Sequence, residues 1–318
     1  MDLYEKMVVQ IERNYTCIAE YKFDNKKDVF LGNKERPRRC RFCGKMEPDV
    51  HFQKVAHTIP HFIGNRTLKS LYECDNCNEK VFSPMESHFS RFMGLYHVLS
   101  HVSRGGKVST YKTDSNSNSK IIVGDEWTDI YCYKDEAISY KYDREKKSIT
   151  ISSKRSYIPI AVYKLFVKMA LSIMPEEEMN YFHTTLTWLM NGSISLPHSF
   201  LIVRIYQSLL PCNGKCMLYK RKTKCVDNVP GYLFGLSYNN IFIQNYLPLC
   251  DNDKTLHGSI TMPLIPCESD KEGYKFIYYD YDLSSNKKVY GENVSLSFSY
   301  ENLKEPKLDL DNEWNHML

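Results

Sequence analysis

The chain has 318 residues, of which 42% are hydrophobic and 25% are charged. These fractions are those of a globular protein and exclude a disordered or fibrous chain, while the length favours two domains. The formal net charge is +4, but residues 34–107 hold 13 Lys and Arg against 7 Asp and Glu, which is a local charge of +6. A polyanionic partner is therefore expected to bind this segment.

In chain order, hydrophobic periodicity predicts a leading helix, a polar connection and a compact segment rich in potential metal ligands. Alternating strands, two helices and a second set of strands follow. The expected ranges are helix 3–21, connection 24–39, ligand-rich segment 40–92, strands within 107–154 (with a hairpin of 138–142 and 148–152), helices 157–174 and 176–191, and strands 200–206, 241–243 and 274–279. Because Gly105-Gly106 breaks the chain, we predict an α+β fold with domains at residues 1–105 and 106–318.

Cysteine usage and the N-terminus predict a cytoplasmic protein. There are 11 cysteines, and residues 1–5 lack the basic start and apolar run of an export signal, so clustered cysteines are expected to bind metal before they form disulfides. The apolar stretch 157–174 is interrupted by Lys164 and Lys168 on one helix face. That pattern predicts a half-buried amphipathic helix, with no membrane span.

Two Cys-x2-Cys pairs carry the strongest signal. Cys40 and Cys43 form the first pair, Cys74 and Cys77 form the second, and 30 residues separate them. Each pair places two thiolates on one tight turn, and two such turns complete a tetrahedral zinc site. Four cysteine ligands leave no open coordination position, so the predicted zinc is structural.

The segment between these pairs contains Val55-Ala56-His57-Thr58-Ile59-Pro60, and the second pair continues directly into Asn78. This order resembles the ββα-metal motif of HNH endonucleases, in the subgroup that a four-cysteine zinc site stabilises. The resemblance covers about residues 38–92. It implies that His57 is the general base that deprotonates water and that Asn78 is an oxygen ligand of a catalytic Mg²⁺ or Mn²⁺.

One position departs from the family. Many members carry Asp or Glu immediately before the histidine, whereas this chain has Ala56. Either another residue supplies the second oxygen, or metal binding is weaker, or the site is degenerate. The candidate substitutes are Glu73, Asp75, Glu86 and His88; Asp75 is also a candidate N-cap, and Ser83 with Glu86 a candidate capping box.

A basic run brackets the first cysteine pair, and beside a phosphodiesterase site it predicts contacts to phosphate. Its members are Lys34, Arg36, Arg38, Arg39, Arg41 and Lys45. The alternative is an ordinary solvated loop. No element is typical of base reading, so little sequence specificity is expected.

Together these patterns favour a metal-dependent nuclease that acts on DNA, with RNA as the alternative substrate. HNH modules with a long extra domain resemble effectors of bacterial anti-phage defence, in which the second domain would bind a signalling ligand or a regulatory protein. Two alternatives remain: a catalytically decayed, zinc-stabilised nucleic-acid-binding module, and a specific nuclease of a mobile element or restriction system. The sequence does not determine the oligomeric state.

Overall fold

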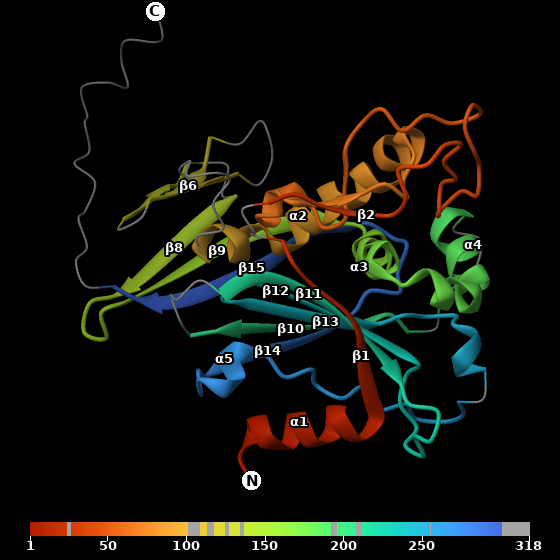
Figure 1. The fold of residues 1–318 in the computed structure, drawn as a ribbon. Coiled ribbons are helices and arrows are strands. Elements are labelled where there is room, and N and C mark those ends of the chain that lie inside the picture. The colour runs from red at the N-terminus through yellow and green to blue at the C-terminus, as the bar shows by residue number, and fades with distance from the viewer. Residues whose placement is uncertain are drawn as a thin grey trace, which may run out of the picture.

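The fold, a computed structural model, is α+β, as the sequence predicted (Figure 1). The structure describes residues 1–23, 27–100, 109–112, 118–124, 127–133, 137–191, 196, 198–207, 212–254 and 256–300. Within these residues no helix is long and apolar enough to cross a membrane.

The N-terminal segment is a helix followed by a strand, which corrects the predicted single helix. Helix α1 covers Leu3–Asn14, and a capping box between Asp2 and Glu5 closes its N-terminus. Strand β1 follows at Tyr15–Lys22 and pairs with strand β11. Residues 15–18 are aromatic, β-branched or cysteine, which favours a strand once a partner is available.

A six-stranded antiparallel sheet forms the centre of the molecule (Figure 1). Its strands, in spatial order, are β1, β11 (Cys212–Arg221), β12 (Tyr232–Asn239), β13 (Ile241–Tyr246), β10 (Phe200–Tyr206) and β14 (Phe276–Asp282). The three strands expected in the second half of the chain are therefore confirmed. The predicted boundary after residue 105 stays a prediction, and β1 places N-terminal residues within this sheet.

Three smaller sheets complete the described part of the fold. Strands β8 (Ile138–Asp143) and β9 (Ser148–Tyr157) form the predicted hairpin, and β15 (Val289–Ser299) extends it. A second sheet contains β5 (Ser109–Tyr111), β6 (Lys120–Val123) and β7 (Thr128–Tyr131). In the third, β2 (Val29–Leu31), β4 (Leu68–Ser70) and β3 (Ala56–His57) lie in that order, which makes β3 an edge strand.

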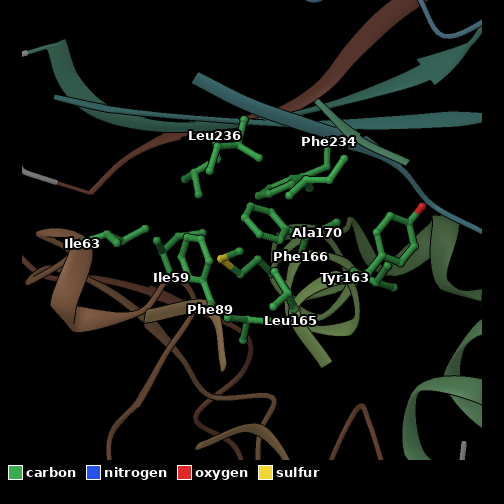
Figure 2. Close-up of a cluster of buried hydrophobic side chains, with 14 of the residues drawn as sticks. Ile59, Ile63, Phe89, Tyr163, Leu165, Phe166, Ala170, Phe234 and Leu236 are labelled. Atoms are coloured by element: carbon green, nitrogen blue, oxygen red, sulfur yellow. The ribbon is translucent and has the colours of Figure 1, made fainter. Parts of the chain in front are cut away.

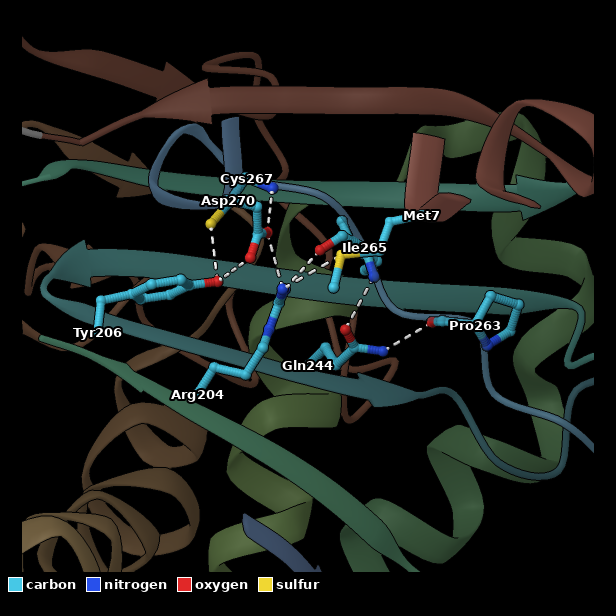
Figure 3. Close-up of polar contacts among 8 residues, drawn as sticks. All are labelled: Met7, Arg204, Tyr206, Gln244, Pro263, Ile265, Cys267 and Asp270. Atoms are coloured by element: carbon cyan, nitrogen blue, oxygen red, sulfur yellow. Dashed lines mark hydrogen bonds and ion pairs between the residues drawn. The ribbon is translucent and has the colours of Figure 1, made fainter. Parts of the chain in front are cut away.

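Both faces of the six-stranded sheet are covered. Leu233 packs with Ile11 of α1 on one face, whereas Phe234, the next residue of β12, packs in the main core with helix α3 (Pro159–Ile173), as the alternation of side chains along a strand requires. On the α1 side, Arg204 is fully buried and forms an ion pair with Asp270, which also accepts a hydrogen bond from Tyr206 (Figure 3). Short elements α5 (Glu268–Lys271) and η4 (Asp251–Asp253) follow β13.

Helix α3 covers Pro159–Ile173 and is buried all round, which corrects the expected half-buried amphipathic helix. Phe166 and Ala170 lie between Phe234 of the six-stranded sheet and Phe89 of the N-terminal part of the chain (Figure 2). The second predicted helix is divided into η3 (Glu176–Phe182) and α4 (His183–Asn191). Lys168 is only 1% exposed, because the six-stranded sheet and the N-terminal part of the chain cover the helix from both sides (Figure 2). The sequence of the helix alone does not predict these two partners.

Candidate active site of a zinc-stabilised nuclease module

Strands β3 and β4 and the helical segment that follows them form a ββα unit. The four cysteines lie together where this helical segment begins, at Cys77. A π-helical turn, η2 (Cys77–Phe82), runs directly into α2 (Ser83–Leu99), and the 3-10 turn η1 (His61–Ile63) lies in the loop between the strands. Buried Asn65 closes that loop, because its amide donates to the carbonyls of Ile59 and Leu68 and its oxygen accepts from the backbone of Thr67 and Leu68.

The four predicted zinc ligands come together. Their sulfur atoms all lie within 4.8 Å of one another, and the Cys40–Cys77 and Cys43–Cys74 pairs are each 3.8 Å apart. Zn–S bonds of about 2.3 Å place the sulfurs of a tetrahedral site about 3.8 Å apart, so this donor set fits zinc. The hydrogen bond between Cys40 and Cys77 lowers the pKa of Cys40 to about 5, whereas burial raises the pKa of Cys74 to about 11.

His57 lies at the end of β3 and is half-buried. Partial burial is the main cause that lowers the pKa of its imidazole below the ordinary value, and the positive charges of His61, Lys69 and Lys168 lower it further, while Asp28 opposes them. A lowered pKa keeps the ring neutral near pH 7, which is the state that accepts a proton. The ring of exposed His61 lies edge-on to His57 at 5.6 Å between centroids.

Asn78 lies at the first turn of η2, where its backbone N–H donates to the carbonyl of Cys74. The second cysteine pair therefore fixes the backbone that carries Asn78. Its side chain is half-buried, and its amide oxygen is a suitable ligand for Mg²⁺ or Mn²⁺.

The structure gives two of the four candidate substitutes for the missing acid a structural role. The carboxylate of Asp75 accepts the backbone N–H groups of Gln53 and Lys54, at 3.0 and 2.9 Å, so the N-cap prediction was wrong. His88 Nδ1 accepts the N–H of Ile158, at 3.3 Å. Among the described residues, the four cysteines are the only group of three or more His, Cys, Asp or Glu side chains within metal-binding reach.

The other two candidates, Glu73 and Glu86, are carboxylates whose pKa burial raises, with Lys168 opposing that shift in both. The predicted capping box of Ser83 and Glu86 is wrong, because α2 continues from η2 and has no side-chain cap. Glu73 is 2% exposed and forms an ion pair with Lys168.

The basic run divides into exposed and buried members. Arg36, Arg39 and Lys45 are exposed, as a phosphate contact requires. The guanidinium of Arg38 is 12% exposed, pairs with Glu47 and stacks on Phe52.

Arg41 is more deeply buried, with a side chain only 3% exposed. It donates to the carbonyls of Leu171 and Met174 at the end of α3. The burial of Arg38 and Arg41 does not support their predicted contact with phosphate.

Residues 40–93 match the family model of HNH endonucleases. This segment is an HNH endonuclease module. No curated protein and no solved structure matches the chain. The matched segment contains the four cysteines, His57 and Asn78. Sequence reasoning missed Lys168, which lies outside the HNH module and contacts it; the only signal was a lysine in a largely apolar helix.

Proposed function

We propose that this protein is a metal-dependent endonuclease that hydrolyses the phosphodiester bonds of DNA with little sequence specificity. The observation that carries the proposal is His57, a histidine with a lowered pKa at the end of β3 within an HNH module. RNA remains the alternative substrate, since backbone contacts alone do not distinguish the two.

In the proposed reaction, His57 takes a proton from a water molecule, whose oxygen attacks phosphorus while the bond to the leaving oxygen breaks. Asn78 would hold the divalent cation, which when bound stabilises the charge that develops on the phosphate. The four-cysteine zinc site would fix both residues, because Asn78 follows directly on Cys77. Exposed Arg36, Arg39 and Lys45 would contact the phosphates on either side of the cut.

We further propose that residues 106–318 restrain the HNH module until a signalling ligand or regulatory protein binds, as in bacterial anti-phage defence. The support is physical: an unspecific DNase in the cytoplasm is toxic unless it is restrained. Helix α3 packs against α2, and the rings of Phe89 and Phe166 are in edge-to-face contact with 5.0 Å between centroids. A conformational change in residues 106–318 would reach the HNH module through this contact.

The test is nicking of supercoiled plasmid by purified protein with Mg²⁺, with Mn²⁺ or with EDTA. We expect cation-dependent cleavage to a smear, and a rate that His57→Ala lowers by roughly 10²–10⁴-fold. Zinc content and DNA affinity should remain as in wild type. Discrete fragments would instead indicate a specific nuclease.

One observation favours a second candidate function, a zinc-stabilised nucleic-acid-binding module without catalysis. Ala56 replaces the usual acid, and no described carboxylate joins His57 in a preformed cluster. Binding of DNA without cleavage under any cation would select this function.

A further inference from the structure

Lys168 of α3 reaches the candidate active site from outside the HNH module. Its side chain is 2% exposed, and its ammonium donates a hydrogen bond to the backbone carbonyl of His57 at 2.9 Å. The same nitrogen forms an ion pair with Glu73, also at 2.9 Å, and the Glu73 side chain is fully buried. Lys168 therefore connects the proposed base with the residue that precedes the second cysteine pair.

The contact matters because β3 has few backbone hydrogen bonds. Strand β3 contributes two residues to its sheet, and among the described strands it pairs with β4 alone, at the edge. Burial of Ala56 holds the strand against the core, and the charged donor on the His57 carbonyl adds a directional restraint.

The same ammonium lies 5.4 Å from the centroid of the Phe82 ring, at the end of η2, the turn that carries Asn78. The end of β3, Glu73 beside the second cysteine pair, and the turn that carries Asn78 thus each contact the Lys168 ammonium. A second contact joins the HNH module to the end of α3, where Arg41 binds the carbonyls of Leu171 and Met174. Any displacement of α3 would therefore move the backbone of His57.

We propose that Lys168 is a positioning residue for His57, and that α3 thereby couples residues 106–318 to the nuclease site. The proposal rests on the proposed function, in which His57 is the base. Lys168 fixes the peptide that carries the imidazole and does not itself touch the substrate.

The charge of Lys168 adds a second effect on His57. Burial is the main cause that lowers the pKa of His57; His61, Lys69 and Lys168 lower it further, while Asp28 opposes them. Removal of the Lys168 charge should therefore raise this pKa.

Helix α3 itself provides the matched control. Lys164 lies one turn earlier and is also buried, at 8% exposure, but its ammonium donates to the carbonyls of Trp188 and Leu189. Lys164→Met removes the same kind of buried cation from the same helix, and among the described residues Lys164 forms no hydrogen bond or ion pair with His57 or Glu73.

The experiment compares wild type with Glu73→Gln/Lys168→Met, in which no unpaired charge is left buried, and with Lys164→Met. Zinc content and DNA affinity are measured first, then kcat, KM and the pH profile of cleavage. We expect the double variant to keep zinc and KM, to lose at least ~10-fold in kcat because the base is misplaced, and to move its acid limb to higher pH. Lys164→Met should change neither kcat nor the pH profile.

A folded double variant with the kcat and pH profile of wild type would overturn the proposal, as would equal losses in Lys164→Met. An NMR titration of the His57 ring, assigned with His57→Gln, keeps the test independent of activity. If wild type does not cleave at all, the proposed function fails. A change in the chemical shifts of the neutral His57 ring that occurs in the double variant and not in Lys164→Met then still supports positioning by Lys168, and unchanged chemical shifts refute it.

Discussion

Replacement of Arg41 by leucine tests whether this buried arginine stabilises the fold or, as the basic run predicts, contacts phosphate. The guanidinium donates to the carbonyls of Leu171 and Met174, at 2.7 and 2.8 Å, and stacks on Tyr72 at 3.5 Å. The carbonyl of Leu171 also accepts the backbone N–H of Met174, so Arg41→Leu leaves the Met174 carbonyl as the acceptor without a donor. A buried acceptor left without a donor costs about 1–3 kcal/mol. The ion pair with Glu176 adds little, since that carboxylate is 66% exposed. Arg41→Leu should therefore lower the free energy of unfolding by about 1–3 kcal/mol.

Urea denaturation measures this loss. With an m-value of about 3 kcal/mol/M, the upper end of the usual range, the midpoint should fall by about 0.3–1 M. The control is Arg39→Leu, because Arg39 is exposed and should change stability by less than about 0.5 kcal/mol. DNA binding should show the opposite pattern. Loss of one phosphate contact lowers the slope of log affinity against log salt concentration by about 0.9, and we expect this loss in Arg39→Leu and not in Arg41→Leu. An unchanged urea midpoint together with a lower salt slope in Arg41→Leu would refute the assignment.

Three further predictions concern the zinc, the base and the exposed cations. Cys74→Ser should release zinc and unfold the HNH module, because metal binding supplies folding energy; elemental analysis with circular dichroism measures both, and a folded, zinc-free protein contradicts the site. The lowered pKa of His57 should place the acid limb of kcat/KM below the ordinary histidine value of about 6.5, with activity rising as pH increases through it; a limb above pH 7 argues against this base. Arg36→Glu/Lys45→Glu should weaken binding equally for all DNA sequences and flatten its salt dependence, so an unchanged slope would leave these residues as a solvated loop.

Much of the HNH module could be predicted from the sequence, because its signals are local. Two residues separate the cysteines of each pair, and Asn78 follows Cys77 directly, so the chain itself places these groups within one or two turns. The hairpin of β8 and β9 could be predicted for the same reason, since its alternating strands flank a four-residue polar turn.

The features that depend on residues distant in the sequence became evident only in the tertiary structure. The basic pattern treats Arg39 and Arg41 alike, but α3, more than 100 residues later, buries Arg41 and leaves Arg39 exposed. The end of the leading helix was missed because β11 supplies the partner that makes residues 15–22 a strand. Lys168 reads as one polar face of a helix, and its role depends on the carbonyl of His57 and the carboxylate of Glu73, which packing alone brings to it. Groups a few residues apart, such as the two cysteines of each pair, are held together by the backbone, so their spacing predicts the site. The partner of a buried charge lies elsewhere in the chain, so it depends on which helices and strands pack around that charge.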